Sequence, residues 1–285
     1  MLSLKTTPLK KQFFILLFLL ASVCGRSQTV IVSKLLDSVS KKPIPFANIG
    51  IPRKGLGSVS DENGNFQLTI PDSLLKFPLK ISCLGYNTKI FYANKFTPNT
   101  IYMGPSSLSL NEVTVFEKKK LTKTTIGNTR ARPSIELAYK AEDLGYEMGV
   151  KVNVKHSRTR LKKLKFSIGT GSFDSILFRF NVYEVDQFGF PGENILKQTI
   201  LVHVPAKSRR VEVDLSEYNI VVNDDFFLAL EWIKKTGEMK TKTDYLSFDS
   251  EMMSGGTYYR KTSQDKWSLL FDYGVGAGLC VDVEY

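Results

Sequence analysis

Short runs of alternating hydrophobic and polar residues dominate the chain from residue 28 onward. In NFQLTI, residues Phe66, Leu68 and Ile70 fall on one face and polar residues on the other, the two-residue period of a half-buried strand. Turn residues such as Asn63-Gly64 separate these runs, and Gly64 tolerates the positive φ of a tight turn. The spacing of the runs over residues 28–116 predicts an antiparallel β-sandwich.

A second β-rich block extends over residues 148–285. In SILFRFNVYEV, hydrophobic residues alternate with polar ones and then slip out of step, which indicates a β-bulge. FFLALEWI is apolar almost throughout, as expected of a strand that is buried on both faces. About ten such runs favour a jelly-roll-like double sheet. We therefore predict an all-β chain, with a seven-stranded sandwich followed by a jelly-roll-like sandwich.

Residues 117–147 separate the two blocks and have a different composition. The segment EKKKLTKTTIGNTRARPS over residues 117–134 is basic, rich in threonine and poor in aromatics, so we interpret it as an extended linker. Residues 135–147, IELAYKAEDLGYE, have loosely helical spacing and predict one short helix.

The first 27 residues have the pattern of a secretory signal peptide. Lys5, Lys10 and Lys11 precede the apolar run FFILLFLL, which is shorter than the roughly 20 residues of a membrane-spanning helix. We place cleavage after Ser27 and expect an exported protein of the periplasm, cell envelope or extracellular space, with no transmembrane span. Lipidation at Cys24 is the less favoured alternative, because bulky Val23 precedes it.

Charge and cysteine content narrow the classes of partner. The net charge of +11 falls to +7 without residues 1–27, which carry four cations and no acid. The basic runs Lys118–Lys120 and Lys162–Lys163 are short and not interleaved with aromatics, so nucleic acid is not an expected partner. Cys83 and Cys280 lie in apolar runs, and we favour two buried thiols over a disulfide.

An ordered set of motifs resembles a known family. PIPFANI at residues 43–49 is followed by GLGSVSDENGNF at 55–66, ISCLGY at 81–86 and LNEVTV at 110–115. This order resembles the carboxypeptidase regulatory-like domain common in exported Bacteroidetes proteins, over about residues 29–116. The resemblance implies a seven-stranded, transthyretin-like sandwich that serves as a folding or interaction module and not as a catalyst. The segments PGENILKQTILVHV, VEVDLSEYNIVV and FFLALEWI resemble C-terminal jelly-roll-like domains of Bacteroidetes envelope proteins.

The sequence contains no complete catalytic or metal-binding signature. His156 and His203 are the only histidines, and neither has a glutamate three positions later, so we expect no zinc-peptidase centre, no metal and no cofactor. The chain also lacks a Gly-x-Ser-x-Gly elbow. Asp61, Glu62 and Asn63 do not continue as a calcium loop and are interpreted as a structural turn.

Aromatic residues of the second block are the candidate ligand contacts. We single out Tyr258, Tyr259 and Trp267, with Arg260 as a polar partner. A wider set comprises Arg179, Tyr183, Trp232, Tyr245 and Tyr273. The alternative is that these rings fill the core of the sandwich. If residues 258 and 259 lie in a strand, their side chains point to opposite faces, so one of them is expected to be exposed.

These observations favour an exported, non-catalytic binding or scaffold protein of the cell envelope. Its expected partner is an envelope protein or a polysaccharide, since exposed aromatics and polar groups on a β-sandwich recognise either. The alternative is an envelope hydrolase, peptidase-like or glycosidase-like, whose site is assembled from scattered residues, because the geometry of such a site does not depend on sequence order.

Overall fold

The computed structural model describes residues 28–106, 121–140, 145–169, 174–205, 208–236, 245–270 and 274–285. The predicted signal peptide with Cys24, the Lys118–Lys120 run and Tyr273 lie outside these residues. Strands and three short 3-10 helices make up the regular structure, with no α-helix in the described ranges. The prediction of an all-β chain is confirmed. Within those same ranges, no helix has the length and hydrophobicity to cross a membrane.

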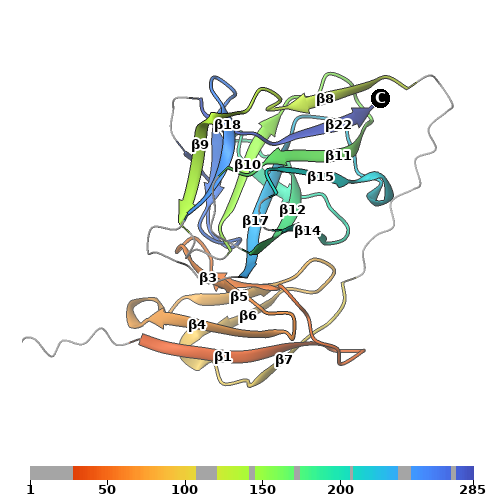
Figure 1. Ribbon diagram of the computed structural model, residues 1–285. Helices are drawn as coiled ribbons and strands as arrows, with labels where there is room; N and C mark the ends of the chain where they lie inside the picture. The colour runs from red at the N-terminus through yellow and green to blue at the C-terminus, as the bar shows by residue number, and fades with distance from the viewer. Residues whose placement is uncertain are drawn as a thin grey trace, which may run out of the picture.

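The N-terminal sandwich consists of seven strands in two sheets that enclose one core (Figure 1). One sheet has the order β4-β1-β7 and the other β3-β2-β5-β6. Buried side chains from both sheets, among them Leu35, Ile49, Ile70 and Leu79, fill the space between them. The strands are β1 (Gln28–Asp37), β2 (Asn48–Ile51), β3 (Leu56–Val59), β4 (Asn65–Pro71), β5 (Pro78–Ser82), β6 (Lys89–Tyr92) and β7 (Thr100–Met103), with η1 (Asp72–Leu74) and η2 (Ala93–Lys95).

The Asp61–Gly64 segment forms the tight turn that the sequence predicts. The Asp61 carboxylate accepts hydrogen bonds from the backbone N–H groups of Asn63 and Asn65, both at 2.8 Å. Gly64 has a φ of +77°, and a Cβ atom there would lie 2.4 Å from the carbonyl oxygen of Leu35. The turn therefore requires glycine both for its backbone angle and for the approach of β1.

The C-terminal sandwich pairs a seven-stranded sheet with a five-stranded sheet. The first has the order β13-β12-β17-β10-β19-β20, with β14 also paired to β12. The second has the order β15-β11-β22-β8, with β16 also paired to β11, and a three-stranded sheet β21-β18-β9 completes the block. The elements are β8 (Lys123–Gly127), β9 (Arg132–Lys140), β10 (Glu147–Val152), β11 (Thr159–Ser167), β12 (Ser175–Val185), β13 (Pro191–Asn194), β14 (Ile200–Pro205), β15 (Arg210–Asp214), η3 (Ser216–Tyr218), β16 (Val221–Val222), β17 (Phe226–Thr236), β18 (Tyr245–Glu251), β19 (Thr257–Arg260), β20 (Ser268–Leu270), β21 (Gly276–Ala277) and β22 (Cys280–Glu284).

One hydrophobic core joins these sheets into a jelly-roll-like sandwich. Phe178 and Phe180 of β12 and Leu228 of β17 meet Leu164 of β11 and Val281 of β22 in it. The predicted slip at the end of β12 is present, because its pairing with β13 shifts register between residues 183 and 185. Residues 226–233 of β17 are buried without interruption, which confirms the prediction of a strand covered on both faces.

The predicted linker over residues 117–147 needs correction in its described part. Residues 123–127 form β8, which pairs with the C-terminal strand β22, and residues 132–140 form β9, which pairs with β18. The predicted helix at 135–147 is therefore wrong. Ile135 and Leu137 point to one face with the two-residue period of a strand, and β-branched Thr124 and Thr125 favour extended backbone. Both strands belong to the C-terminal sandwich.

Candidate functional site

Six polar side chains lie on the outer face of the seven-stranded sheet, the face turned away from its core. Alternation places Arg179, Asn181 and Tyr183 of β12 on this face, because their neighbours Phe178, Phe180 and Val182 enter the core. The remaining three come from adjacent strands and are Glu147 of β10, Glu231 of β17 and Arg260 of β19. The pairing register brings Glu231 directly opposite both Glu147 and Arg179, and Glu147 opposite Arg260.

Glu147 is the centre of the network and is 0% exposed. Its carboxylate accepts hydrogen bonds from Asn181 Nδ2, Tyr183 Oη and Arg260 Nε, each at 2.7 Å. Arg260 Nη2 also donates to the Tyr183 hydroxyl at 2.8 Å and lies 2.5 Å from the carboxylate. Every charge in this group thus has a partner, as a buried ion pair requires.

Two aromatic rings enclose the Arg260 guanidinium. Its central carbon lies 4.6 Å from the ring centroid of Trp267 and 5.4 Å from that of Tyr183, and the two rings meet edge to face. Burial lowers the pKa of Arg260, but the Glu147 carboxylate outweighs it, so the pKa lies above its usual range. Burial has the opposite effect on the neutral acid Tyr183 and raises its pKa well above 10. Both Arg260 and Tyr183 therefore keep their protons.

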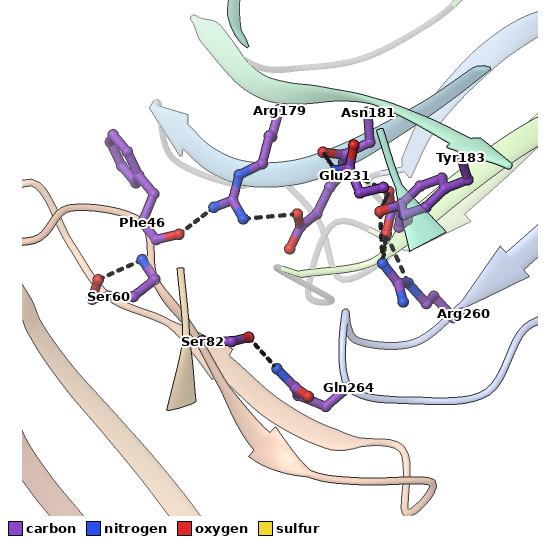
Figure 2. Close-up of polar contacts among 12 residues, drawn as sticks. Phe46, Ser60, Ser82, Arg179, Asn181, Tyr183, Glu231, Arg260 and Gln264 are labelled. Atoms are coloured by element: carbon purple, nitrogen blue, oxygen red, sulfur yellow. Dashed lines mark hydrogen bonds and ion pairs between the residues drawn. The ribbon is translucent and has the colours of Figure 1, made fainter. Parts of the chain in front are cut away.

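Arg179 joins this outer face to the N-terminal sandwich, which lies directly below it (Figures 1 and 2). Its Nη1 atom pairs with Glu231 Oε2 at 3.2 Å, and its Nη2 atom donates to the backbone carbonyl of Phe46. Nearby, Gln264 Nε2 donates to Ser82 Oγ at 2.8 Å, as Figure 2 also shows. We call this contact region between the two sandwiches the seam.

Local geometry of the PIPFAN segment explains why the Phe46 carbonyl is available to Arg179. Phe46 has a left-handed φ of 56°, which is uncommon for an aromatic residue. Buried Ser60 fixes both sides of it, because its hydroxyl donates to the Ile44 carbonyl and accepts from Ala47 N–H. Glycine allows the opposite sandwich to come close, since a Cβ atom at Gly50 would lie 3.1 Å from Gln264 Cγ.

Glu231 is the least satisfied charge at the seam. It is 1% exposed, and no hydrogen-bond partner for its Oε1 atom is found in the described part of the chain. Burial raises its pKa to about 7, against the opposing effect of the Arg179 charge. Burial also raises the pKa of the Cys83 thiol, on which the charges of Arg179 and Glu231 act as well. Cys83 of the N-terminal sandwich therefore lies close to the ion pair.

Three of the four candidate ligand contacts share the outer face. Arg260 and Trp267 belong to the network above, and Tyr258 meets Phe190 and Phe227 edge to face at 5.5 and 4.8 Å. Tyr259 points to the opposite face, where it stacks on Tyr146 at 5.7 Å. The predicted opposite orientation of residues 258 and 259 is confirmed. The expectation that one of them is exposed is wrong, because both side chains are half-buried against neighbouring aromatic rings.

The other residues considered from the sequence have separate surroundings. Trp232 lies in the core, which agrees with the alternative that the aromatic rings fill the sandwich. The side chain of Tyr245 is outside the described structure. Exposed His156 stacks on Tyr285 at 4.0 Å, whereas exposed His203 belongs to β14. No group of three or more potential metal-ligating acids, histidines or cysteines occurs within the described residues.

Cys83 and Cys280 are free thiols and are half-buried. The preference for thiols over a disulfide is therefore confirmed, although the burial is less complete than we expect from the sequence. They belong to different sandwiches, in line with their separation along the chain.

The Lys162–Lys163 run lies on the outer face of the five-stranded sheet. A register shift between Leu161 and Lys163 accompanies it, and both lysines line an open groove of about 480 Å³. Acidic neighbours compensate the charge there, since Lys163 pairs with Glu212 at 3.0 Å and Lys165 with Asp282 at 2.7 Å. This face is a solvated, charge-balanced surface.

Sequence analysis misses Glu147, Glu231 and Asn181, which hold the outer face together. A signal is nevertheless present, because Arg179 and Asn181 interrupt the apolar run of β12 at alternate positions and Glu231 is the lone charge in FFLALEWI. Such interruptions indicate a polar cluster beneath a second layer, but the partners become apparent only from the register of strands far apart in sequence.

Comparison with protein families identifies the first sandwich. Residues 33–115 match the family model of the CarboxypepD_reg-like domain. This segment is therefore similar to the CarboxypepD_reg-like domain. Domains of this family are typically non-catalytic. The match ends within the segment between β7 and β8, so the C-terminal sandwich lies outside it. No curated protein is significantly similar to the chain in sequence.

Among solved structures, the chain is similar to viral proteins at low identity. The structure of infectious bursal disease virus, Gx strain, has a TM-score of 0.31 and 10% identity, over 90% of this chain and 59% of that chain. The Gt strain gives 0.28 and 11%, over 90% and 63%. The spike protein P1 of bacteriophage PM2 gives 0.12 and 10%, over 91% and 96%. TM-scores this low carry no argument about the function of either sandwich.

Proposed function

We propose that the chain is an exported, non-catalytic binding or scaffold protein of the cell envelope. One observation carries this proposal: buried Glu147 and Tyr183 on the outer face are bonded to each other and to Arg260. Glu147 is fully hydrogen-bonded and sealed, and Arg260 is held between it and two rings. Groups that are fixed in this way stabilise a surface and hold two sandwiches together, but they do not transfer protons to a substrate.

The recognition surface that we propose is the aromatic patch, defined as Phe188, Phe190, Tyr258 and Trp267. Phe188 is 74% exposed and lies two residues before Phe190, whose ring contacts Tyr258. Leu269, opposite Tyr258 in the register, extends the apolar surface. Exposed apolar patches on soluble domains mark interaction sites, and aromatic rings stack on sugars as well as on protein side chains. The expected partner is an envelope polysaccharide or an envelope protein.

A binding survey tests the proposal. The full chain is immobilised and exposed to fractionated envelope polysaccharides and envelope proteins, and retained material is quantified. A Phe188→Ala, Tyr258→Ala double variant is expected to lose at least about tenfold in affinity, since it removes two apolar contacts. Met253→Ala is the matched control, because Met253 is 91% exposed in a different turn. No retention of either class, or equal retention by the double variant, contradicts the proposal.

The second candidate function is a glycosidase-like envelope hydrolase, and one observation favours it. Glu147 and Glu231 are paired carboxylates directly opposite each other, and the pKa of Glu231 is raised, as is common for catalytic acids. Their burial opposes it, because a substrate reaches them only if the seam opens. Turnover of aryl glycosides by the pure chain that disappears in Glu231→Gln supports this candidate, and no turnover above the Glu231→Gln background eliminates it.

A further inference from the structure

We propose that the seam between the two sandwiches is a proton-linked latch, tightest at mildly acidic pH and looser as the pH rises, with Glu231 as the group that takes up the proton. The inference is independent of any ligand of the aromatic patch. It concerns how firmly the two sandwiches are held together and when the outer face becomes accessible.

Arg179 is the structural basis of the latch. It belongs to β12 of the C-terminal sandwich, yet one of its guanidinium nitrogens bonds the Phe46 carbonyl of the N-terminal sandwich while another pairs with Glu231 (Figure 2). Leu84, next to Cys83, packs against the core of the C-terminal sandwich. The N-terminal sandwich thus covers the ion pair, and separation of the two admits water to Glu231.

The charged surroundings of Glu231 leave it with one counter-ion. The groups whose charges act with it are Arg179 and Tyr183 from β12, Glu147 from β10, Arg260 from β19 and Cys83 from the N-terminal sandwich. Arg260 is committed to Glu147 at 2.5 Å, so Arg179 is the cation that remains for Glu231. Asn181 also lowers the pKa of Glu231, yet the Oε1 atom has no hydrogen-bond partner among the described residues, which is costly for an ionised carboxylate away from water.

The sign of the pH effect follows from the two states of the seam. In the closed seam, burial raises the pKa of Glu231 to about 7, whereas contact with water returns it toward the ordinary 4.5. Between these values the closed form binds more protons than the open form. Closing is therefore favoured as the pH falls from about 7 toward 4.5. Above pH 7 the carboxylate is ionised in both forms and the ratio stays at its lowest value.

The Cys83 thiol reports on opening, because it lies at the seam and its partial burial in the closed form slows its reaction. The full chain with Cys24→Ser and Cys280→Ser keeps this single thiol. Its labelling rate by an uncharged maleimide is measured at pH 6 and pH 8 and divided by the rate of the same chain in denaturant, which cancels the ordinary dependence on thiolate. The normalised rate is expected to be several-fold to tenfold higher at pH 8.

Two variants distinguish the latch from general loosening. The side chain in Glu231→Gln is uncharged at both pH values, so this variant is expected to show the same normalised labelling rate at pH 6 and pH 8. Lys234→Ala removes the exposed ion pair with Glu62, which also spans the two sandwiches at 2.8 Å. This variant is expected to keep the difference in labelling rate between pH 6 and pH 8. Equal normalised rates in the parent chain, or an unchanged pH response in Glu231→Gln, overturn the proposal.

A measurement without Glu231→Gln guards against a variant that fails to fold. Hydrogen exchange of residues 46–50 and 261–265 in the parent chain is expected to be faster, relative to core amides, at pH 8 than at pH 6. Equal protection of these amides, relative to core amides, at pH 6 and pH 8 also overturns the proposal of a latch. Neither readout uses a ligand, so its outcome is separate from that of the binding survey.

Discussion

Two glutamates face each other across β10 and β17 but have very different surroundings at the scale of single residues. Glu147 has three donors, one of which is the Arg260 cation, whereas Glu231 shares Arg179 with the Phe46 carbonyl. Two equally buried carboxylates therefore have different roles. Glu147 stabilises the outer face of the sheet, whereas the protonation state of Glu231 affects how firmly the seam is held.

Loss of Arg260 is expected to be strongly destabilising. Arg260→Ala leaves the Glu147 carboxylate buried without its cation, so the free energy of unfolding is expected to fall by about 3–5 kcal/mol, measured by urea denaturation at pH 7. Lys163→Ala is the control, since its pair with Glu212 is largely solvated and is worth about 0–1 kcal/mol. A cost for Arg260→Ala no larger than that of the control contradicts the account of the network.

Gly64 provides a second test at this scale. Gly64→Ala forces a left-handed φ on a residue with a side chain and drives its Cβ to 2.4 Å from the Leu35 carbonyl, so a loss of at least about 2 kcal/mol is expected. Gly189→Ala separates strain from crowding, because Gly189 has a φ of +82° but nothing within 4 Å. Its cost is expected to be about 1 kcal/mol. Similar costs at the two positions in thermal unfolding are the contrary result.

At the scale of elements, β8 and β9 decide where the C-terminal sandwich begins. β8 is the edge neighbour of the C-terminal strand β22, and β9 supplies the partner of β18. Without β8 and β9, one edge of β22 and one edge of β18 have no hydrogen-bonded neighbour. Such unpaired edges favour aggregation over folding.

Two fragments test this boundary. Residues 121–285 are expected to give a β-type circular-dichroism spectrum and a cooperative thermal transition. Residues 148–285, which begin where the second hydrophobic block begins in the sequence, are expected to aggregate or to unfold without cooperativity. A cooperative transition of equal midpoint in both fragments shows that β8 and β9 are dispensable.

Sequence patterns predict elements of this chain well where one face alternates and poorly where tertiary contacts decide. The period of Phe66, Leu68 and Ile70 and the continuous run of β17 are read correctly. The threonines of β8 are not, because a polar edge strand and a polar linker have the same composition. The candidate site follows the same logic, since the aromatic positions are visible in the sequence but the partners of Arg260 depend on register.

At the scale of the whole molecule, the seam makes the two sandwiches one body. Hydrogen bonds from Arg179 and Gln264 and the ion pair between Lys234 and Glu62 cross it. The orientation of the aromatic patch relative to the N-terminal sandwich is thereby fixed, which is what a scaffold requires.

Coupling across the seam is measurable by calorimetry. The parent chain is expected to unfold in one transition at pH 6, because buried contacts link the two cores. Arg179→Ala removes the bond to the Phe46 carbonyl and the side chain that joins the two sandwiches, so two separate transitions are expected. Lys234→Ala is expected to keep the single transition. One transition of unchanged width in Arg179→Ala contradicts the coupling.

The position of β22 sets the timing of assembly. The last strand of the chain lies inside the five-stranded sheet, between β11 and β8, and its Asp282 bonds Thr125 from 157 residues earlier. The larger sandwich therefore cannot close until residues 280–284 have left the ribosome and, in an exported protein, the translocation channel. The smaller sandwich, complete by Met103, folds first, and its partner follows slowly through contacts distant in sequence.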